Sequence, residues 1–231
     1  MATSPAPGFY GNYATFKRYT TPEIGRKHIR RFDSLVWKPA ACTAAMRFLE
    51  IGCGTGPFLA YLAAKGCTDF VGIDHDPALA EVVPAAVRDR FVCGDLRDLL
   101  ADPAVAAFDR IVALDVLEHF TAEEGRALLE RAAEKLRPGG RIVLRVPNAA
   151  SPWGLTYQQG DLTHRTAFSP GALRQLADAA GLTATAILPQ AEGRRRRVFT
   201  DRLVHGFLSW ALLNPPEIWS ANIVAILEPR R

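Results

Sequence analysis

From residue 46 onward, the chain alternates short apolar runs with longer segments of helical periodicity, and this alternation restricts the possible folds most strongly. The apolar runs predict strands over 47–52, 69–74, 90–93, 108–114, 141–146, 182–188 and 222–227. The segments between them predict helices over 57–65, 77–87, 121–136 and 169–180. Strands that alternate with helices imply a parallel sheet covered on both faces. The expected fold class is therefore α/β, with a doubly wound, mainly parallel, seven-stranded sheet.

Three segments lie outside this alternation. Residues 1–45 predict one helix over 22–37, and we expect them to form an N-terminal helical extension or lid on a domain that comprises residues 46–231. Residues 147–168 predict a loop too long to be a simple connection, and loops of that length are usually functional. Residues 194–220 combine an arginine run with an apolar helical pattern over 203–213.

Composition narrows the class of protein. Apolar residues make up 48% of the chain, which is enough for a sizeable core. No stretch approaches the roughly 20 apolar residues of a membrane span, and the first residues lack the basic and apolar regions of a secretory signal. The four cysteines form no Cys-x-x-Cys pair, which is typical of a reduced chain. We expect a cytoplasmic protein with no integral membrane span.

The positive net charge comes from one place in the sequence. Lys and Arg number 28 and Asp and Glu 24, and the run Arg194 to Arg197 accounts for the whole excess. A nucleic-acid partner is therefore not expected, because such proteins usually carry a broad basic face. Basic residues ahead of an apolar helix could give weak peripheral contact with anionic lipid. A substrate lid or a homodimer contact is the favoured interpretation of this segment.

A glycine-rich turn joins the first predicted strand to the first helix, in the sequence Glu50-Ile-Gly-Cys-Gly-Thr-Gly56. Glycines at alternate positions let the backbone turn sharply and approach a ligand closely. Such a turn at the carboxyl end of a strand builds a nucleotide cofactor site. Asp74 ends the second strand, where a carboxylate can accept both hydroxyls of a ribose. The spacing departs from Gly-x-Gly-x-x-Gly, which favours a cofactor without phosphates.

Further motifs follow in order. The third strand ends at Gly94-Asp95-Leu96, where an acidic side chain can accept the adenine amino group and Leu96 can cover the ring. The fourth strand continues into Leu114-Asp-Val-Leu-Glu-His-Phe120, and Leu136-Arg-Pro-Gly-Gly-Arg141 leads into the fifth. Together these motifs resemble those of class I S-adenosylmethionine-dependent methyltransferases. Residues 148–170 resemble, more loosely, the methyltransferases of bacterial glycan and secondary-metabolite pathways.

The resemblance implies a Rossmann-like methyltransferase fold with S-adenosylmethionine as cofactor. It assigns Gly52, Cys53, Gly54 and Gly56 to the methionine part, with Glu50 organising the turn. Asp74 would hold the ribose with His75 beside it, and Asp95 and Leu96 would face the adenine. Asp115 and Val116 would complete the wall near the methionine.

Two histidines are candidates for the general base. His164 is favoured, because it lies in the long loop after the fifth strand and Asp161 stands three residues before it, where it could orient the ring. His119, just beyond the fourth strand, is the alternative, although it could equally tie the following helix to the loop. No metal is expected, since Asp115 lacks an acidic partner at the end of the fifth strand.

The leading hypothesis is O-methylation of a sugar hydroxyl or another small hydroxylated or carboxylated metabolite, with a small-molecule or glycan acceptor. N-methylation of a small amine is an alternative within the same class. Nicotinamide-dependent reduction shares the glycine turn, but the chain lacks both Gly-x-Gly-x-x-Gly and a Tyr-x-x-x-Lys pair. The remaining alternative is a non-catalytic module that binds S-adenosylmethionine.

Overall fold

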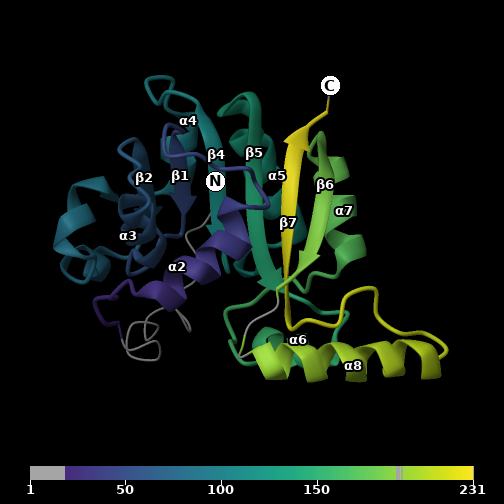
Figure 1. The fold of residues 1–231 in the computed structure, drawn as a ribbon. Coiled ribbons are helices and arrows are strands. Elements are labelled where there is room, and N and C mark those ends of the chain that lie inside the picture. Colours follow the sequence, from purple (N-terminus) through teal and green to yellow (C-terminus); the bar gives the residue numbers. More distant parts are fainter. Residues whose placement is uncertain (1–18, 191–192, 194, 231) are drawn as a thin grey trace.

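The chain folds around one twisted sheet, shown in the computed structural model of Figure 1, which describes residues 19–190, 193 and 195–230. Seven strands form the sheet in the order β3-β2-β1-β4-β5-β7-β6. Their bounds are β1 Phe48–Ile51, β2 Phe70–Asp74, β3 Phe91–Cys93, β4 Phe108–Leu114, β5 Leu136–Pro147, β6 Leu182–Pro189 and β7 Asn222–Pro229. Only β7 runs antiparallel to its neighbours, β5 and β6. The predicted doubly wound, mainly parallel sheet is confirmed.

Helices cover both faces of the sheet. They are α2 Arg26–Phe32, α3 Pro57–Ala64, α4 Leu96–Ala101, α5 Ala122–Glu134, α6 Pro152–Gln159, α7 Pro170–Ala179 and α8 Arg195–Ala211. Successive residues of a strand point to opposite faces. Leu49 and Ile111 accordingly join a core with α4, α5 and α7, while Phe48 and Val112 join a second core with α2 and α3.

Helix α2 is an integral part of the second core. The ring centroid of Phe32 lies 5.3 Å from that of Phe58 and 5.1 Å from that of Tyr61. The Tyr61 hydroxyl also donates a hydrogen bond of 2.7 Å to Oδ1 of Asp33, in the π-helical turn Asp33–Trp37 that follows α2. This packing holds α2 beside the carboxyl end of β1.

Two of the predicted helices differ in the structure. Residues 77–87 form two short 3₁₀ segments, Pro77–Glu81 and Ala85–Arg90, instead of one helix. Pro84 lies between them and has no N–H for a helical hydrogen bond, which explains the interruption. Helix α8 begins at Arg195, so it includes most of the arginine run that the sequence pattern placed before it.

Other segments contain more structure than predicted. The 147–168 loop includes α6, which Ser151 caps by accepting a hydrogen bond from the N–H of Trp153. Helix α4 was not predicted, and six residues are too few to show a clear helical period. Strand β5 begins at Leu136, so the Pro138-Gly139-Gly140 segment belongs to an irregular start of the strand.

The carboxyl ends of the parallel strands meet at one edge of the sheet. In Figure 1, α6 and α8 lie beyond the end of β5 at that same edge. Within the described residues, no helix is long and apolar enough to cross a membrane.

Candidate active site

The turn between β1 and α3 is built from three glycines with left-handed backbone. The φ angle is +65° at Gly52, +52° at Gly54 and +78° at Gly56, a region that residues with a Cβ atom rarely adopt. At Gly52, a Cβ atom would also lie 2.5 Å from Cγ2 of Val116. The backbone conformation therefore favours glycine at all three positions, and close packing also requires it at Gly52. The turn places the N-terminus of α3 at the end of β1.

A cavity of about 300 Å³ lies beside this turn. Its wall comes from α2, the glycine turn and the ends of β4 and β5. Of the residues predicted to bind the cofactor, five line the cavity: Glu50, Gly52, Cys53, Gly54 and Asp115. The others lie outside its lining: Gly56, Asp74, His75, Asp95, Leu96 and Val116.

Both signs of charge line this cavity. Glu50 is buried, and its Oε2 atom has no hydrogen-bond partner among the described residues. Burial, followed by the nearby charge of Asp74, raises the pKa of Glu50 well above its usual value. Arg31 reaches the lining from α2, and Arg145 forms an ion pair with Asp115, whose φ is +60°. A ligand with a cationic group near Glu50 would provide the missing partner and favour the ionised carboxylate.

Asp74 ties the end of β2 to the glycine turn. Its Oδ2 accepts a hydrogen bond of 2.9 Å from the N–H of Gly54, and its Oδ1 accepts one of 3.2 Å from the N–H of Asp76. Nδ1 of His75 lies 3.3 Å from Oδ1. Burial alone would raise the pKa of Asp74, but the contacts with His75 and the two amides outweigh it and lower the pKa. Asp74 is therefore an ionised acceptor next to the turn.

The predicted adenine contacts lie at the next strand end. Asp95 is exposed and caps α4, because its Oδ1 accepts a hydrogen bond of 2.7 Å from the N–H of Arg97. Leu96 is half-buried and packs against the core. Helix capping uses one oxygen of Asp95 and leaves the other for a ligand.

Two histidines and a buried glutamate form a cluster after β4. The rings of His119 and His164 lie 4.7 Å apart in an edge-to-face arrangement. Nε2 of His164 lies 4.0 Å from Oε1 of Glu118. Nδ1 of His164 lies 3.1 Å from the carbonyl oxygen of Gln158, and because a carbonyl only accepts, this nitrogen carries the proton. The His164 side chain is only 8% exposed, which limits contact with an acceptor.

Glu118 is fully buried, and neither of its carboxylate oxygens is hydrogen-bonded among the described residues. Burial, with the nearby charge of Asp115 as the second cause, raises its pKa to about 8. Between about pH 5 and pH 8 this carboxyl is therefore protonated in the folded chain and ionised in the unfolded chain. Unfolding then releases a proton, so this group lowers the free energy of unfolding as the pH rises through that range.

The substitution Glu118→Gln should remove this pH dependence. We expect the stability of the variant relative to the parent to increase between pH 5 and pH 8, because glutamine does not ionise. Urea denaturation at several pH values measures the difference. Glu134→Gln, at an exposed position at the end of α5, is the matched control and should follow the parent. Parallel pH curves for Glu118→Gln and the parent would contradict the elevated pKa.

Asp161 contacts Thr163, which in turn lies next to His119. Its Oδ1 accepts hydrogen bonds from the Thr163 N–H at 3.0 Å and from the Thr163 hydroxyl at 2.5 Å. The Thr163 hydroxyl oxygen lies 2.9 Å from Nδ1 of His119. Since the single hydroxyl proton goes to Asp161, Thr163 must accept from His119, which leaves the lone pair of the neutral ring on Nε2. The ring nitrogens of His164 lie near the Gln158 carbonyl and Oε1 of Glu118. Asp161 acts through Thr163 on His119.

The same cluster is the group of described residues best suited to hold a metal ion. Glu118, His119 and His164 each offer one ligand atom, and these atoms lie within 4.8 Å of one another. Two imidazoles and a carboxylate suit Zn²⁺ or Fe²⁺. Paired acidic residues at the strand ends do not indicate this set, because its ligands come from the turn after β4 and the loop after β5.

Sequence patterns also missed Arg31 and Thr163. Arg31 lies in the N-terminal extension, far along the chain from the glycine motif, and only the packing of α2 brings it to the cavity. Thr163 stands between the candidate residues Asp161 and His164. Its two-residue spacing from Asp161 is typical of an Asx-turn, a signal that could have indicated this contact.

Comparison with known proteins now identifies the family. Residues 22–187 match the family model described as a methyltransferase domain. The chain belongs to this family. The chain is 37% identical over 91 residues to magnesium-protoporphyrin O-methyltransferase from Rhodobacter capsulatus, covering 36% of this chain and 38% of that protein. It is 29% identical over 138 residues to a tRNA (carboxymethyluridine(34)-5-O)-methyltransferase from Xenopus tropicalis, covering 59% of this chain and 19% of that protein. The chain thus matches less than half the length of either relative.

Solved structures share the fold of the methyltransferase domain. A SAM-dependent methyltransferase from Archaeoglobus fulgidus aligns with a TM-score of 0.66 and 19% identity, over 95% of this chain and 99% of that one. Other structures with this fold contain bound S-adenosylmethionine or S-adenosylhomocysteine. The family resemblance stated from the sequence motifs is confirmed.

Proposed function

We propose that the protein transfers a methyl group from S-adenosylmethionine to an oxygen atom of a small metabolite. The observation that carries the proposal is the cavity at the glycine turn, which combines a left-handed glycine backbone with opposite charges. S-adenosylmethionine supplies an electrophilic methyl group, and the protein mainly has to align the acceptor with it. Membership of the methyltransferase-domain family supports the same chemistry.

The charges of the cavity suit the amino-acid end of this cofactor. Arg31 can hold the carboxylate of the methionine moiety, because a guanidinium is well matched to a carboxylate. The buried carboxylate of Glu50 can accept a hydrogen bond from the ammonium group of that moiety. Asp74 at the end of β2 can then accept hydrogen bonds from the ribose hydroxyls. A nucleotide with a pyrophosphate would instead bring negative charge next to Glu50.

We expect Arg31→Ala to weaken S-adenosylhomocysteine binding by about 5- to 30-fold, the value of one charge-assisted hydrogen bond in a partly exposed site. Calorimetry measures the dissociation constant. Methylthioadenosine lacks the amino-acid end, so the parent and the variant should bind it equally well. Arg30→Ala is the matched control, since Arg30 is the exposed neighbour in α2 and donates to the carbonyl of Arg26. If Arg31→Ala weakened the binding of both ligands equally, the role of Arg31 would be to pack α2 and not to bind the amino-acid end.

His119 is the proposed general base. Thr163 and Asp161 hold its ring in the tautomer with the lone pair on Nε2, the form that removes a proton from an alcohol or phenol. His119 follows Asp115, a cavity residue, by four positions in the 3₁₀ turn Leu117–His119. An oxygen acceptor such as a sugar hydroxyl gains most from such a base, whereas a neutral amine gains less. This difference favours O-methylation over N-methylation and over a non-catalytic binding role.

Methyl transfer from radiolabelled S-adenosylmethionine to a panel of acceptors tests the proposal. The panel contains sugars, phenols, carboxylic acids, amines and unmodified tRNA. Transfer to an alcohol or phenol is the expected result. Transfer only to an amine or to tRNA would overturn the assignment of the acceptor, and tight binding of nicotinamide cofactors without S-adenosylmethionine binding would overturn the reaction class.

A further inference from the structure

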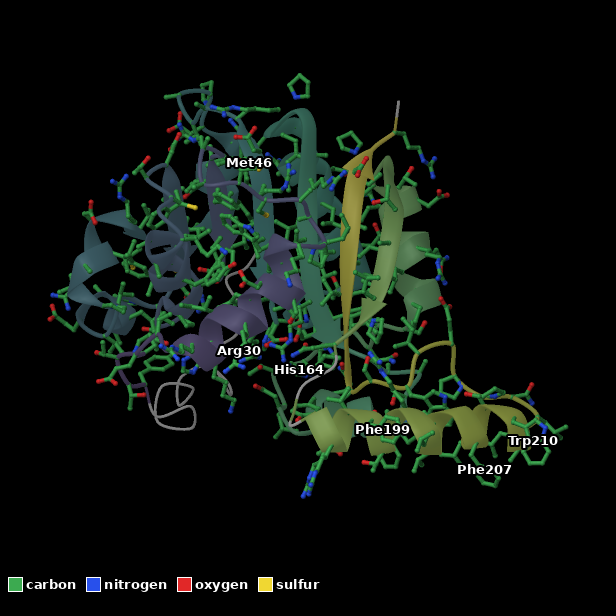
Figure 2. All side chains as sticks on the ribbon, viewed as in Figure 1. Arg30, Met46, His164, Phe199, Phe207 and Trp210 are labelled. Carbon is green, nitrogen blue, oxygen red and sulfur yellow. The ribbon has the colours of Figure 1, made fainter. Side chains whose placement is uncertain are left out.

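Helix α8 presents an apolar stripe to the outside of the molecule. Phe199, Leu203, Phe207 and Trp210 are 63%, 59%, 61% and 81% exposed. Their spacing of four, four and three residues places them on one face of the helix. Figure 2 shows the labelled Phe199, Phe207 and Trp210 on the side of α8 that points away from the sheet. So many large exposed side chains along one helix indicate a contact surface.

The opposite face of α8 is fixed to the rest of the protein. Nε1 of Trp153 donates a hydrogen bond of 2.9 Å to Nε2 of His205. The His205 ring stacks on Trp219 with centroids 5.0 Å apart and an interplanar angle of 6°. Nε1 of Trp219 donates to the Ser209 hydroxyl at 2.8 Å. These contacts set the rotation of α8, so the apolar stripe faces outward as a consequence of the fold.

Positive charge surrounds the stripe. Arg196 lies one helical turn before Phe199 on the same face, and Arg202 flanks the stripe, whereas Arg197 lies toward Trp153 and His205; all three are exposed. Among the described residues, no carboxylate forms an ion pair with any of these three arginines. The single acidic residue of α8, Asp201, lies 3.1 Å from Nδ1 of His205 on the inner side. An anionic partner would therefore find the guanidinium groups of Arg196 and Arg202 next to the aromatic side chains of the stripe.

We propose that α8 docks in the plane of an anionic lipid surface, with the stripe in the acyl boundary and the arginines at the headgroups. Exposed aromatic residues flanked by arginine are the composition of interfacial helices. In Figure 1, α8 lies at the sheet edge where β5 ends, the edge that carries the candidate active site. Docking would therefore bring this edge of the protein close to the bilayer. The proposal does not depend on the methyl-transfer assignment.

A second copy of the chain fits this face less well. If two α8 helices paired antiparallel, the arginine-rich start of one would lie beside the end of the other, where the exposed Leu212 and Leu213 follow the helix. The next acidic residue, Glu217, is already paired with Arg174. Anionic headgroups supply the missing negative charge. The sequence pattern favoured a lid or a homodimer contact, and the outward aromatic stripe changes that preference.

Cosedimentation with vesicles tests the proposal. The full chain is mixed with vesicles of phosphatidylcholine alone, or with part of the lipid replaced by phosphatidylglycerol. We expect bound protein to increase with phosphatidylglycerol and to decrease as salt is added. The double variant Phe207→Ser, Trp210→Ser should bind at least about tenfold more weakly, and Arg196→Gln with Arg202→Gln should lose the dependence on anionic lipid. Val92→Ser removes an exposed apolar side chain from β3 and is the matched control.

Circular dichroism and S-adenosylhomocysteine binding show whether each variant folds. Vesicle binding by the parent protein tests the proposal even if a variant does not fold. Failure of the parent to bind phosphatidylglycerol vesicles at low salt would overturn the proposal. A dimer of the parent in sedimentation equilibrium that the Phe207→Ser, Trp210→Ser variant abolishes, without vesicle binding, would assign the stripe to a second copy instead.

Discussion

The variant His119→Asn is expected to lower kcat by about 10²- to 10⁴-fold, the usual contribution of a positioned general base. Asparagine keeps a polar side chain near Thr163 but cannot accept the proton of the substrate. The dissociation constant of S-adenosylmethionine should change little, since His119 does not line the cavity at the glycine turn. Single-turnover kinetics and calorimetry measure the two quantities separately.

Variants of the neighbouring residues decide how His119 is held. Thr163→Val removes the hydroxyl that contacts Nδ1 of His119 and should slow turnover by a smaller factor than His119→Asn. Combined with His119→Asn it should add little, because residues that act as one unit are not additive. Fully additive losses would mean that Thr163 stabilises the loop and does not act through His119.

His164→Asn separates the base from a metal site. If His119 alone acts as base, His164→Asn should retain most of the turnover, and a chelator such as EDTA should have no effect. If Glu118, His119 and His164 hold a required ion, EDTA and His164→Asn should both abolish turnover, and added Zn²⁺ or Fe²⁺ should restore the chelated enzyme. A large loss in His164→Asn without sensitivity to EDTA would return the role of base to His164.

The sheet could be predicted from the sequence because each strand carries its own signal. Short apolar runs mark all seven strands, although β5 begins at Leu136, ahead of its apolar run. The helices were less certain where local chemistry competes with periodicity. Pro84 breaks the segment after β2 into two turns, and α4 is too short to show a period. The outward face of α8 depends on Trp153 and Trp219, which no local pattern connects to that helix.

The candidate site was predictable where it is local in sequence. The glycine turn, Glu50 and Asp115 belong to continuous motifs, and the structure places them around one cavity. Arg31 comes from a segment outside the motifs, and only tertiary packing could reveal it. For the histidines, spacing alone does not show whether a nearby carboxylate contacts the ring or the intervening hydroxyl of Thr163.

The variant Asp74→Ala is expected to weaken S-adenosylmethionine binding by about 1–3 kcal/mol, or roughly 5- to 150-fold, because a buried ribose would lose its charged acceptor. Methylthioadenosine keeps the ribose, so Asp74→Ala should weaken both ligands equally. Arg31→Ala should instead affect only the ligand with the amino-acid end. Calorimetry with the two ligands therefore separates the two ends of the proposed site.

Asp74 also holds the glycine turn through the N–H of Gly54, so the loss has two physical sources. Asp74→Asn retains an acceptor oxygen for that amide and removes only the charge, and we expect it to bind more tightly than Asp74→Ala. The matched control is Asp76→Asn, two residues away, whose carboxylate accepts from the Tyr19 hydroxyl and the N–H of Ala78. A 2′,3′-dideoxy analogue of methylthioadenosine completes the experiment. The parent and Asp74→Asn should bind this analogue equally if Asp74 contacts the ribose hydroxyls, whereas an undiminished difference would assign the effect of Asp74 to the turn alone.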